Sequence, residues 1–284
     1  MFSFFEIYDI IVISEVKNML EDIKDSINSN PYIEKDIKDA LFRMIVAFND
    51  KFPNTKLNKF KKLVNDVKVG RISKYESNGV FAYDVNANEI LFSPTKLQDD
   101  YNVDNLFMQA VLEMVTEKDD NNYKFTGFNS ENNLSILNKA YTEILADYLI
   151  GSGEKTDLEE EKKITNQLGI LIGQDTLLNA YLNNDGNKIM LAVAELCVGM
   201  ESLGKTYVTP KTIFDRIEHM GKAHLSGLDI QDDIKYLNDV FEKMVLSKNN
   251  EEDITSLAAY RDLEKQVTLN SYAYQLAGAN VYMK

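Results

Sequence analysis

Apolar side chains recur three and four positions apart along most of this chain. One such series would fall on a single helical face, and it consists of Ile33, Ile37, Leu41, Met44, Ile45 and Phe48. Prolines and glycine- or asparagine-rich stretches interrupt the pattern, as at Pro31 and Pro53. The spacing predicts helices over residues 4–28, 32–50, 56–68, 103–117, 131–150, 157–172, 174–183, 187–202, 209–222, 228–247 and 251–278.

Between the third and fourth of these helices the pattern changes to short extended runs. Residues 79–84 and 89–92 read as two strands joined by the polar turn 85–88, and residues 67–73 are a further candidate strand. The predicted class is therefore α+β, strongly helix-weighted, with a small β-sheet or hairpin packed on a helical core. We expect an N-terminal helical segment (1–70), a core (71–202) and a C-terminal helical segment (203–284), all within one compact unit.

Composition narrows the classes of partner. The formal net charge of −14 argues against nucleic-acid binding, which needs clustered Lys and Arg. Cys197 is the only cysteine and lies in an apolar setting, so no intramolecular disulfide and no thiolate zinc cluster can form. The apolar start contains Glu6 and Asp9 and lacks a basic leader, and we find no stretch of membrane-spanning length. These features predict a cytoplasmic protein with no membrane or nucleic-acid partner.

Two predicted helices follow the hairpin in an informative order. The first carries the run Leu106 to Thr116, a linker contains the Gly127-Phe128 pair, and the second carries the run Leu137 to Leu145. The order of strand, helix and helix over residues 76–182 resembles the zincin metallopeptidases of the thermolysin-like type. In that family one helix bears HExxH and a later helix supplies a glutamate ligand. Two histidines four positions apart reach one metal, and the glutamate activates the bound water.

The chemical positions of that frame are all substituted here. By the resemblance, Gln109 stands at the first histidine, Ala110 at the catalytic glutamate, Glu113 at the second histidine and Lys139 at the third ligand. Neither Gln nor Lys is a usual zinc ligand, and alanine cannot act as a base. Only Glu143 keeps its expected type, as an outer acid one turn after the ligand position. Asn138, Tyr141, Thr142 and the Gly127-Phe128 pair also fit the frame.

The resemblance implies a pseudoenzyme without catalytic residues, metal or cofactor, which binds a peptide or protein through the former substrate cleft. In such a frame the side chains of Glu113 and Lys139 would meet where zinc once sat, so they are predicted to form a salt bridge. We also expect no bound zinc and no peptidase activity.

Two alternatives remain open. In the first, the chain is a helical interaction or assembly protein without zincin ancestry, and Lys139 with Glu143 is a solvated pair four residues apart. A sheet strand lying beside the 103–117 helix would count against it. In the second, the chain is a metal-dependent hydrolase that uses Asp215, Glu218, His219 and His224. Their spacing matches neither HExxH nor its inverse, and a histidine near a helix C-terminus is the simpler interpretation.

Overall fold

The computed structural model describes residues 4–52, 56–71, 81–92, 103–120, 123–128, 134–150, 158–202, 207–248 and 257–262. The chain forms two compact units, Met1–Lys124 and Phe125–Lys284. This division lies inside the segment 71–202 that the sequence predicts as one core. It also differs from the predicted borders at 70/71 and 202/203.

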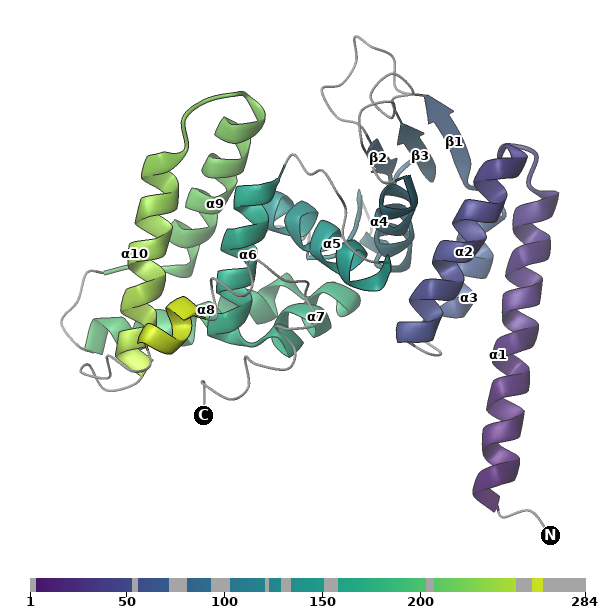
Figure 1. Ribbon diagram of the computed structural model, residues 1–284, viewed down its shortest axis with the longest axis horizontal. Helices are drawn as coiled ribbons and strands as arrows, with labels where there is room; N and C mark the ends of the chain where they lie inside the picture. Colours follow the sequence, from purple (N-terminus) through teal and green to yellow (C-terminus); the bar gives the residue numbers. More distant parts are fainter. Residues whose placement is uncertain are drawn as a thin grey trace. The chain divides into compact units, whose positions relative to one another are not determined.

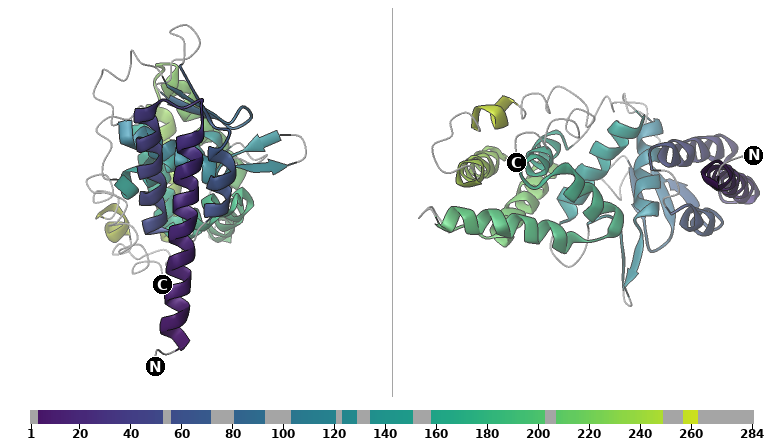
Figure 2. Two further views of the ribbon diagram at one scale, coloured as in Figure 1. Left: turned by 90° about the vertical axis from the view of Figure 1, so that its right-hand side faces the viewer. Right: turned by 90° about the horizontal axis from the view of Figure 1, so that it is seen from below.

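The first unit begins with three helices, α1 (Phe4–Ser29), α2 (Lys35–Lys51) and α3 (Leu57–Val64). Helix α1 packs against both α2 and α3, and all three stand side by side in Figure 1 and in the right-hand view of Figure 2. Their facing sides are apolar, because the periodic positions of each helix turn inward. The side chains that are almost wholly buried there are Ile23, Ile27, Leu41, Ile45, Phe48 and Phe60.

A three-stranded sheet follows, with strands β1 (Lys68–Arg71), β2 (Phe81–Asp84) and β3 (Glu89–Phe92). The strand order is β1-β3-β2, in which β3 pairs parallel with β1 and antiparallel with β2. The hairpin turn is held by the Asp84 carboxylate, which accepts hydrogen bonds from the backbone amides of Asn86 (2.9 Å) and Ala87 (3.1 Å). Asn88 closes the turn in the left-handed region, with φ of 48°.

Helix α4 (Val103–Val115) packs against α2 and against strand β2 of this sheet. Nine of its 13 residues are buried, which explains why its sequence is apolar on most sides. After α4 come two three-residue strands, β4 (Lys118–Asp120) and β5 (Tyr123–Phe125), which pair with each other. The boundary between the two units falls within β5.

From Ser135 onward, the described part of the second unit is built from helices. Its helices are α5 (Ser135–Ile150), α6 (Glu159–Ile172), α7 (Gln174–Asn183), α8 (Gly186–Ser202), α9 (Pro210–Leu225) and α10 (Gln231–Lys248). Helix α6 is central, since it packs against each of the other five. Its residues 164–171 are all buried, as expected for a helix surrounded by others. A short helical turn over 257–262 lies beyond α10.

The predicted α+β, helix-weighted class is confirmed, and ten of the predicted helices correspond to α1–α10. The hairpin and the additional strand near residue 70 are also present. Of the predicted helix 251–278, residues 257–262 are helical, and the remainder lies outside the described residues. In the part of the chain described here, no helix combines the length and the apolar character needed to cross a bilayer.

Candidate functional site

Helix α4 presents the three positions that correspond to HExxH. The Gln109 side-chain amide donates to Asn105 Oδ1 at 2.8 Å, one turn earlier on the same helix. Ala110 is fully buried, and Glu113 is half-buried. The negative charge of Glu113 contributes to raising the pKa of Tyr83 on β2, so this carboxylate lies on the side of α4 that meets the sheet. At the position of the catalytic glutamate stands Ala110, whose methyl group cannot act as a general base.

Helix α5 carries the positions that correspond to the third ligand and its outer acid. Lys139 is exposed, and Glu143 lies 3.9 Å from the Lys162 ammonium on α6. Lys162 also contacts Asp147 at 2.5 Å, so it faces two carboxylates one turn apart on α5. Glu113 belongs to the first unit and Lys139 to the second. Their predicted salt bridge therefore stays a prediction.

The other residues that fit the zincin frame belong to one network of contacts in the second unit. Asn138 Oδ1 accepts a hydrogen bond from the backbone amide of Phe128 at 2.8 Å. The Thr142 hydroxyl lies 2.7 Å from the hydroxyl of Tyr181 on α7. The rings of Phe128, Tyr141 and Tyr181 form a trio with centroid separations of 5.2 to 5.4 Å. This network anchors the 127–128 turn to α5 and α7.

Gly127 is required at that turn. Its φ is +55°, and a Cβ there would collide with Asn138 Oδ1 and lie 2.5 Å from the Tyr181 ring. The sequence resemblance marked Gly127, Phe128, Asn138 and Thr142, but it did not mark Tyr181. That partner lies 39 residues from Thr142 and has no periodic signal of its own.

The alternative metal site on α9 is not assembled as a ligand set. Asp215 pairs with Lys211, one turn earlier. His219 Nδ1 lies 2.9 Å from Asp233 Oδ2 on α10. Among the described residues, no group of three or more His, Cys, Asp or Glu side chains is placed to hold a metal ion.

Glu218 and His224, the other two residues of the alternative metal site, contact other helices of the second unit. The Glu218 carboxylate is buried and accepts hydrogen bonds from Ile136 N (2.6 Å) and Ser135 Oγ (2.8 Å), so it caps the N-terminus of α5. Helix α5 has no acidic residue in its own first turn, so Glu218 supplies the complementary charge. His224 lies in the last turn of α9 and contacts the fully buried Glu161 of α6 at 2.9 Å.

A polar cluster that the sequence did not indicate surrounds the end of α4 in the first unit. The Lys59 ammonium donates to the backbone carbonyls of Val115 (3.1 Å) and Glu117. The Glu117 carboxylate accepts from the Tyr83 hydroxyl (3.3 Å) and pairs with Lys124 (3.2 Å). The pKa of Lys59 is lowered to about 8, chiefly by burial and also by nearby Lys56, while Glu117 acts in the opposite direction.

This shift predicts a pH-dependent stability. The pKa of Lys59 is about 8 when folded and near 10.5 when unfolded, so the unfolded chain binds more protons between these values. The free energy of unfolding should therefore rise with pH from about 8 upward. Because Lys59 is half-buried, we expect on the order of 1 kcal/mol between pH 7.5 and 9.5. Chemical denaturation at several pH values, compared with the Lys59→Met variant, isolates this contribution.

Lys61→Met is the matched control for that experiment. Lys61 is on the same helix but exposed, where it pairs with Asp22 at 2.6 Å. Its removal should leave the pH slope unchanged, whereas Lys59→Met should reduce it. Equal slopes in wild type and Lys59→Met would contradict the assignment.

One pocket of about 250 Å³ lies within the second unit. Its lining residues are Leu171 and Ile172 of α6, Ala192, Glu195, Leu196 and Gly199 of α8, and Ser247 of α10. Cys197 on the same helix does not line it, and burial raises the pKa of this thiol to about 11, as expected for an unreactive cysteine. Sequence periodicity cannot reveal this pocket, because three helices distant in sequence form it.

No protein-family model, curated protein sequence or solved structure matches this chain. The structure itself shows a helix-weighted α+β protein with two compact units.

Proposed function

We propose that this chain is a catalytically inactive, metallopeptidase-like protein that binds a peptide or another protein. The observation that carries the proposal is the packing of α4 against strand β2 of the small sheet. A strand flanking the first helix is what the zincin frame requires. A purely helical assembly protein has no need of such a sheet, so this packing counts against that alternative.

The network around Asn138 gives a second line of support. The resemblance relates Asn138, Thr142 and the Gly127-Phe128 pair to one frame, and these residues bond to one another or to the same aromatic trio. Their proximity is the result expected if the frame remains after its chemistry is lost. The substituted positions agree with a non-catalytic role, since Ala110 is buried without an acid and Gln109 bonds within its own helix.

A gain-of-metal experiment tests the proposal. The variant Gln109→His, Glu113→His, Lys139→Glu restores three zinc ligands but leaves Ala110 unchanged. A glutamate at position 110 would bury a carboxylate and cost several kcal/mol of stability. We expect the triple variant to bind one zinc per chain about 100-fold more tightly than the double variant Gln109→His, Glu113→His. Calorimetric titration with zinc and metal analysis after dialysis provide the measurements.

The wild-type chain serves as the reference in that experiment. Its melting temperature should not respond to zinc or to a chelator, and it should not cleave a denatured protein substrate. If the triple variant keeps its far-ultraviolet circular dichroism but binds zinc no better than the double variant, α4 and α5 do not share a metal frame. The proposal would then be rejected.

A further inference from the structure

The pocket in the second unit is formed where three helices end. Leu171 and Ile172 lie in the last turn of α6, Gly199 in the last turn of α8, and Ser247 in the last turn of α10. The last carbonyl groups of a helix lack partners within it and carry a partial negative charge. The C-terminal carbonyl groups of three helices therefore place partial negative charge near the pocket.

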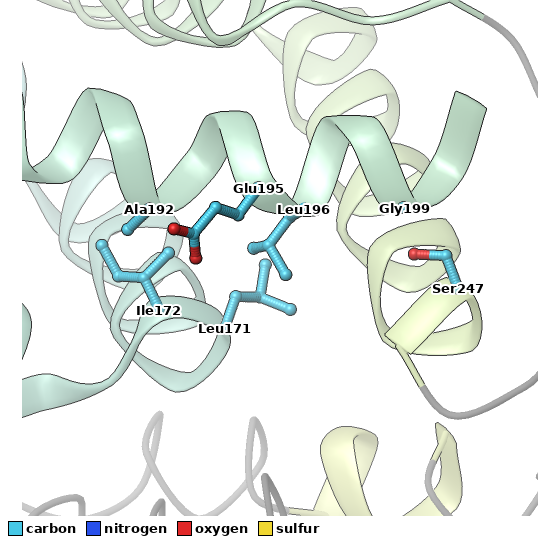
Figure 3. Close-up of a pocket in the computed structure, with 7 residues that line it drawn as sticks. All are labelled: Leu171, Ile172, Ala192, Glu195, Leu196, Gly199 and Ser247. Carbon is cyan, nitrogen blue, oxygen red and sulfur yellow. The ribbon is translucent and has the colours of Figure 1, made fainter. Parts of the chain in front are cut away.

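Within the described part of the chain, no basic side chain in the last turn offsets this partial charge at two of the three helix ends. Neither α6 nor α8 has a basic residue in its last turn. Glu195 adds a full negative charge, and Figure 3 shows its carboxylate beside Ile172 on the pocket wall. Glu195 is exposed, and among the residues described by the structure it has no ion-pair partner. A cation from outside the chain could pair with this carboxylate.

The rest of the pocket wall is apolar. Leu171, Ile172 and Leu196 provide aliphatic surface, and the missing side chain of Gly199 leaves room beside Ser247. A Cβ at Gly199 would lie 3.5 Å from Ser247 Oγ, so a larger side chain there would take up pocket space. A ligand that combines an aliphatic stem with a cationic head matches both parts of this lining.

The size of the pocket favours a side chain over a separate small molecule. Its volume of about 250 Å³ is below the roughly 300 to 1,000 Å³ typical of small-molecule sites. Beside it, Leu191 and Val198 of α8 are 67% and 65% exposed. Two exposed aliphatic residues seven positions apart on one helix give a partner segment further apolar surface to cover.

We propose that the pocket and the exposed side of α8 bind a basic, amphipathic segment of a partner protein. One Lys or Arg side chain of that segment enters the pocket, with its stem against Leu171, Ile172 and Leu196 and its cationic head at Glu195. Aliphatic residues of the segment cover Leu191 and Val198. The inference rests on the proposed function only in taking the chain to bind proteins. The site lies wholly in the second unit and does not involve Gln109, Glu113 or Lys139.

A designed peptide tests the proposal on the full chain. The probe is a fluorescein-labelled 12-residue helical peptide made of Leu, Ala and Lys, and its matched control carries acetyl-lysine at every Lys position. Fluorescence anisotropy should show the basic peptide binding at least tenfold more tightly than the acetylated one, a difference of about 1.4 kcal/mol. Spermidine at equal cation concentration should compete weakly, because it cannot cover Leu191 and Val198.

Variants on α8 locate the binding. Glu195→Gln should weaken binding of the basic peptide about tenfold and leave the acetylated peptide unchanged. Gly199→Leu should weaken both peptides by filling the pocket. Glu201→Gln is the matched control, since Glu201 is an exposed acid on the same helix. It should change the affinity by less than about twofold, because screening limits distant surface charges.

Several outcomes would overturn the proposal. These are the absence of binding at about 1 mM peptide, equal binding of the basic and acetylated peptides, and equal effects of Glu195→Gln and Glu201→Gln. Sedimentation showing a dimer that Glu195→Lys dissociates would assign this surface to a second copy of the chain instead. If spermidine competes as strongly as the unlabelled peptide does, this surface binds free polyamines instead. The zinc titration of the triple variant is independent of each of these results.

Discussion

Replacing His224 with leucine should lower the free energy of unfolding by about 3 kcal/mol, because it leaves a buried carboxylate without its partner. Glu161 is fully buried on α6, and its two oxygens lie 2.9 and 3.1 Å from His224 Nδ1. The carboxylate cannot regain water without opening the contact between α6 and α9. Urea unfolding followed by circular dichroism measures the loss, and hydrogen-exchange mass spectrometry of α6 peptides assigns it to the second unit.

His219→Leu is the matched control on the same helix. His219 Nδ1 also contacts an acid, Asp233, at 2.9 Å, but its side chain is 66% exposed. When His219 is removed, Asp233 still pairs with Arg216, whose Nε lies 2.6 Å from Asp233 Oδ1. The expected loss is therefore less than about 1 kcal/mol. Adding Glu161→Gln to His224→Leu should recover part of the larger loss, since a neutral amide is less costly to bury than a carboxylate. Equal losses for the two histidine variants would contradict this explanation.

Gly127→Ala should destabilise the second unit by about 3 to 5 kcal/mol, by combining a left-handed backbone with a steric collision. The added Cβ would collide with Asn138 Oδ1, which accepts the hydrogen bond from Phe128 N, and would lie 2.5 Å from the Tyr181 ring. Relief of the collision requires the aromatic trio to move. Near-ultraviolet circular dichroism should report this change, because the chain has 15 tyrosines and no tryptophan.

Gly227→Ala separates the two effects. Gly227 has φ of +72°, but a Cβ there would find nothing within 4 Å. Its substitution should cost only the backbone strain, about 1 to 2 kcal/mol. The excess for Gly127→Ala then measures the collision in the 127–128 turn. If both variants lose the same amount, the turn is not tightly packed against α5 and α7.

The sequence predicts this fold well where periodicity is strong. Helices α7 and α8 begin and end within one residue of their predicted bounds, because Gly173 and residues 183–186 interrupt the pattern clearly. The start of α2 is less accurate, at Lys35 instead of residue 32. There the Asn30 side chain accepts from Tyr32 N at 2.8 Å and donates to Val64 O and Val67 O, each at 2.9 Å. These last two partners are more than 30 residues away and cannot be inferred from local sequence.

Strands β4 and β5 were missed for a physical reason. Each has only three residues, and Lys118, Asp119 and Asp120 are all exposed, so β4 has no apolar alternation to detect. The candidate sites show the same limit. The buried carboxylate of Glu218 caps a helix whose first amides lie 82 residues earlier, and the pocket proposed to bind a cationic side chain depends on where three helices end. Local sequence predicts where the helices lie, but it does not predict which helix ends contact one another.

The order of strands in the small sheet also affects the chain while it is being synthesised. Strands β1 and β2 each pair with β3, which is the last of the three in sequence. A nascent chain that ends before Glu89 therefore carries both outer strands of the sheet but not the strand that joins them. Closing the β2–β3 hairpin requires only the four-residue turn, whereas docking of β1 closes a longer loop and is entropically slower. The central strand thus sets the moment at which the packing surface for α4 is complete.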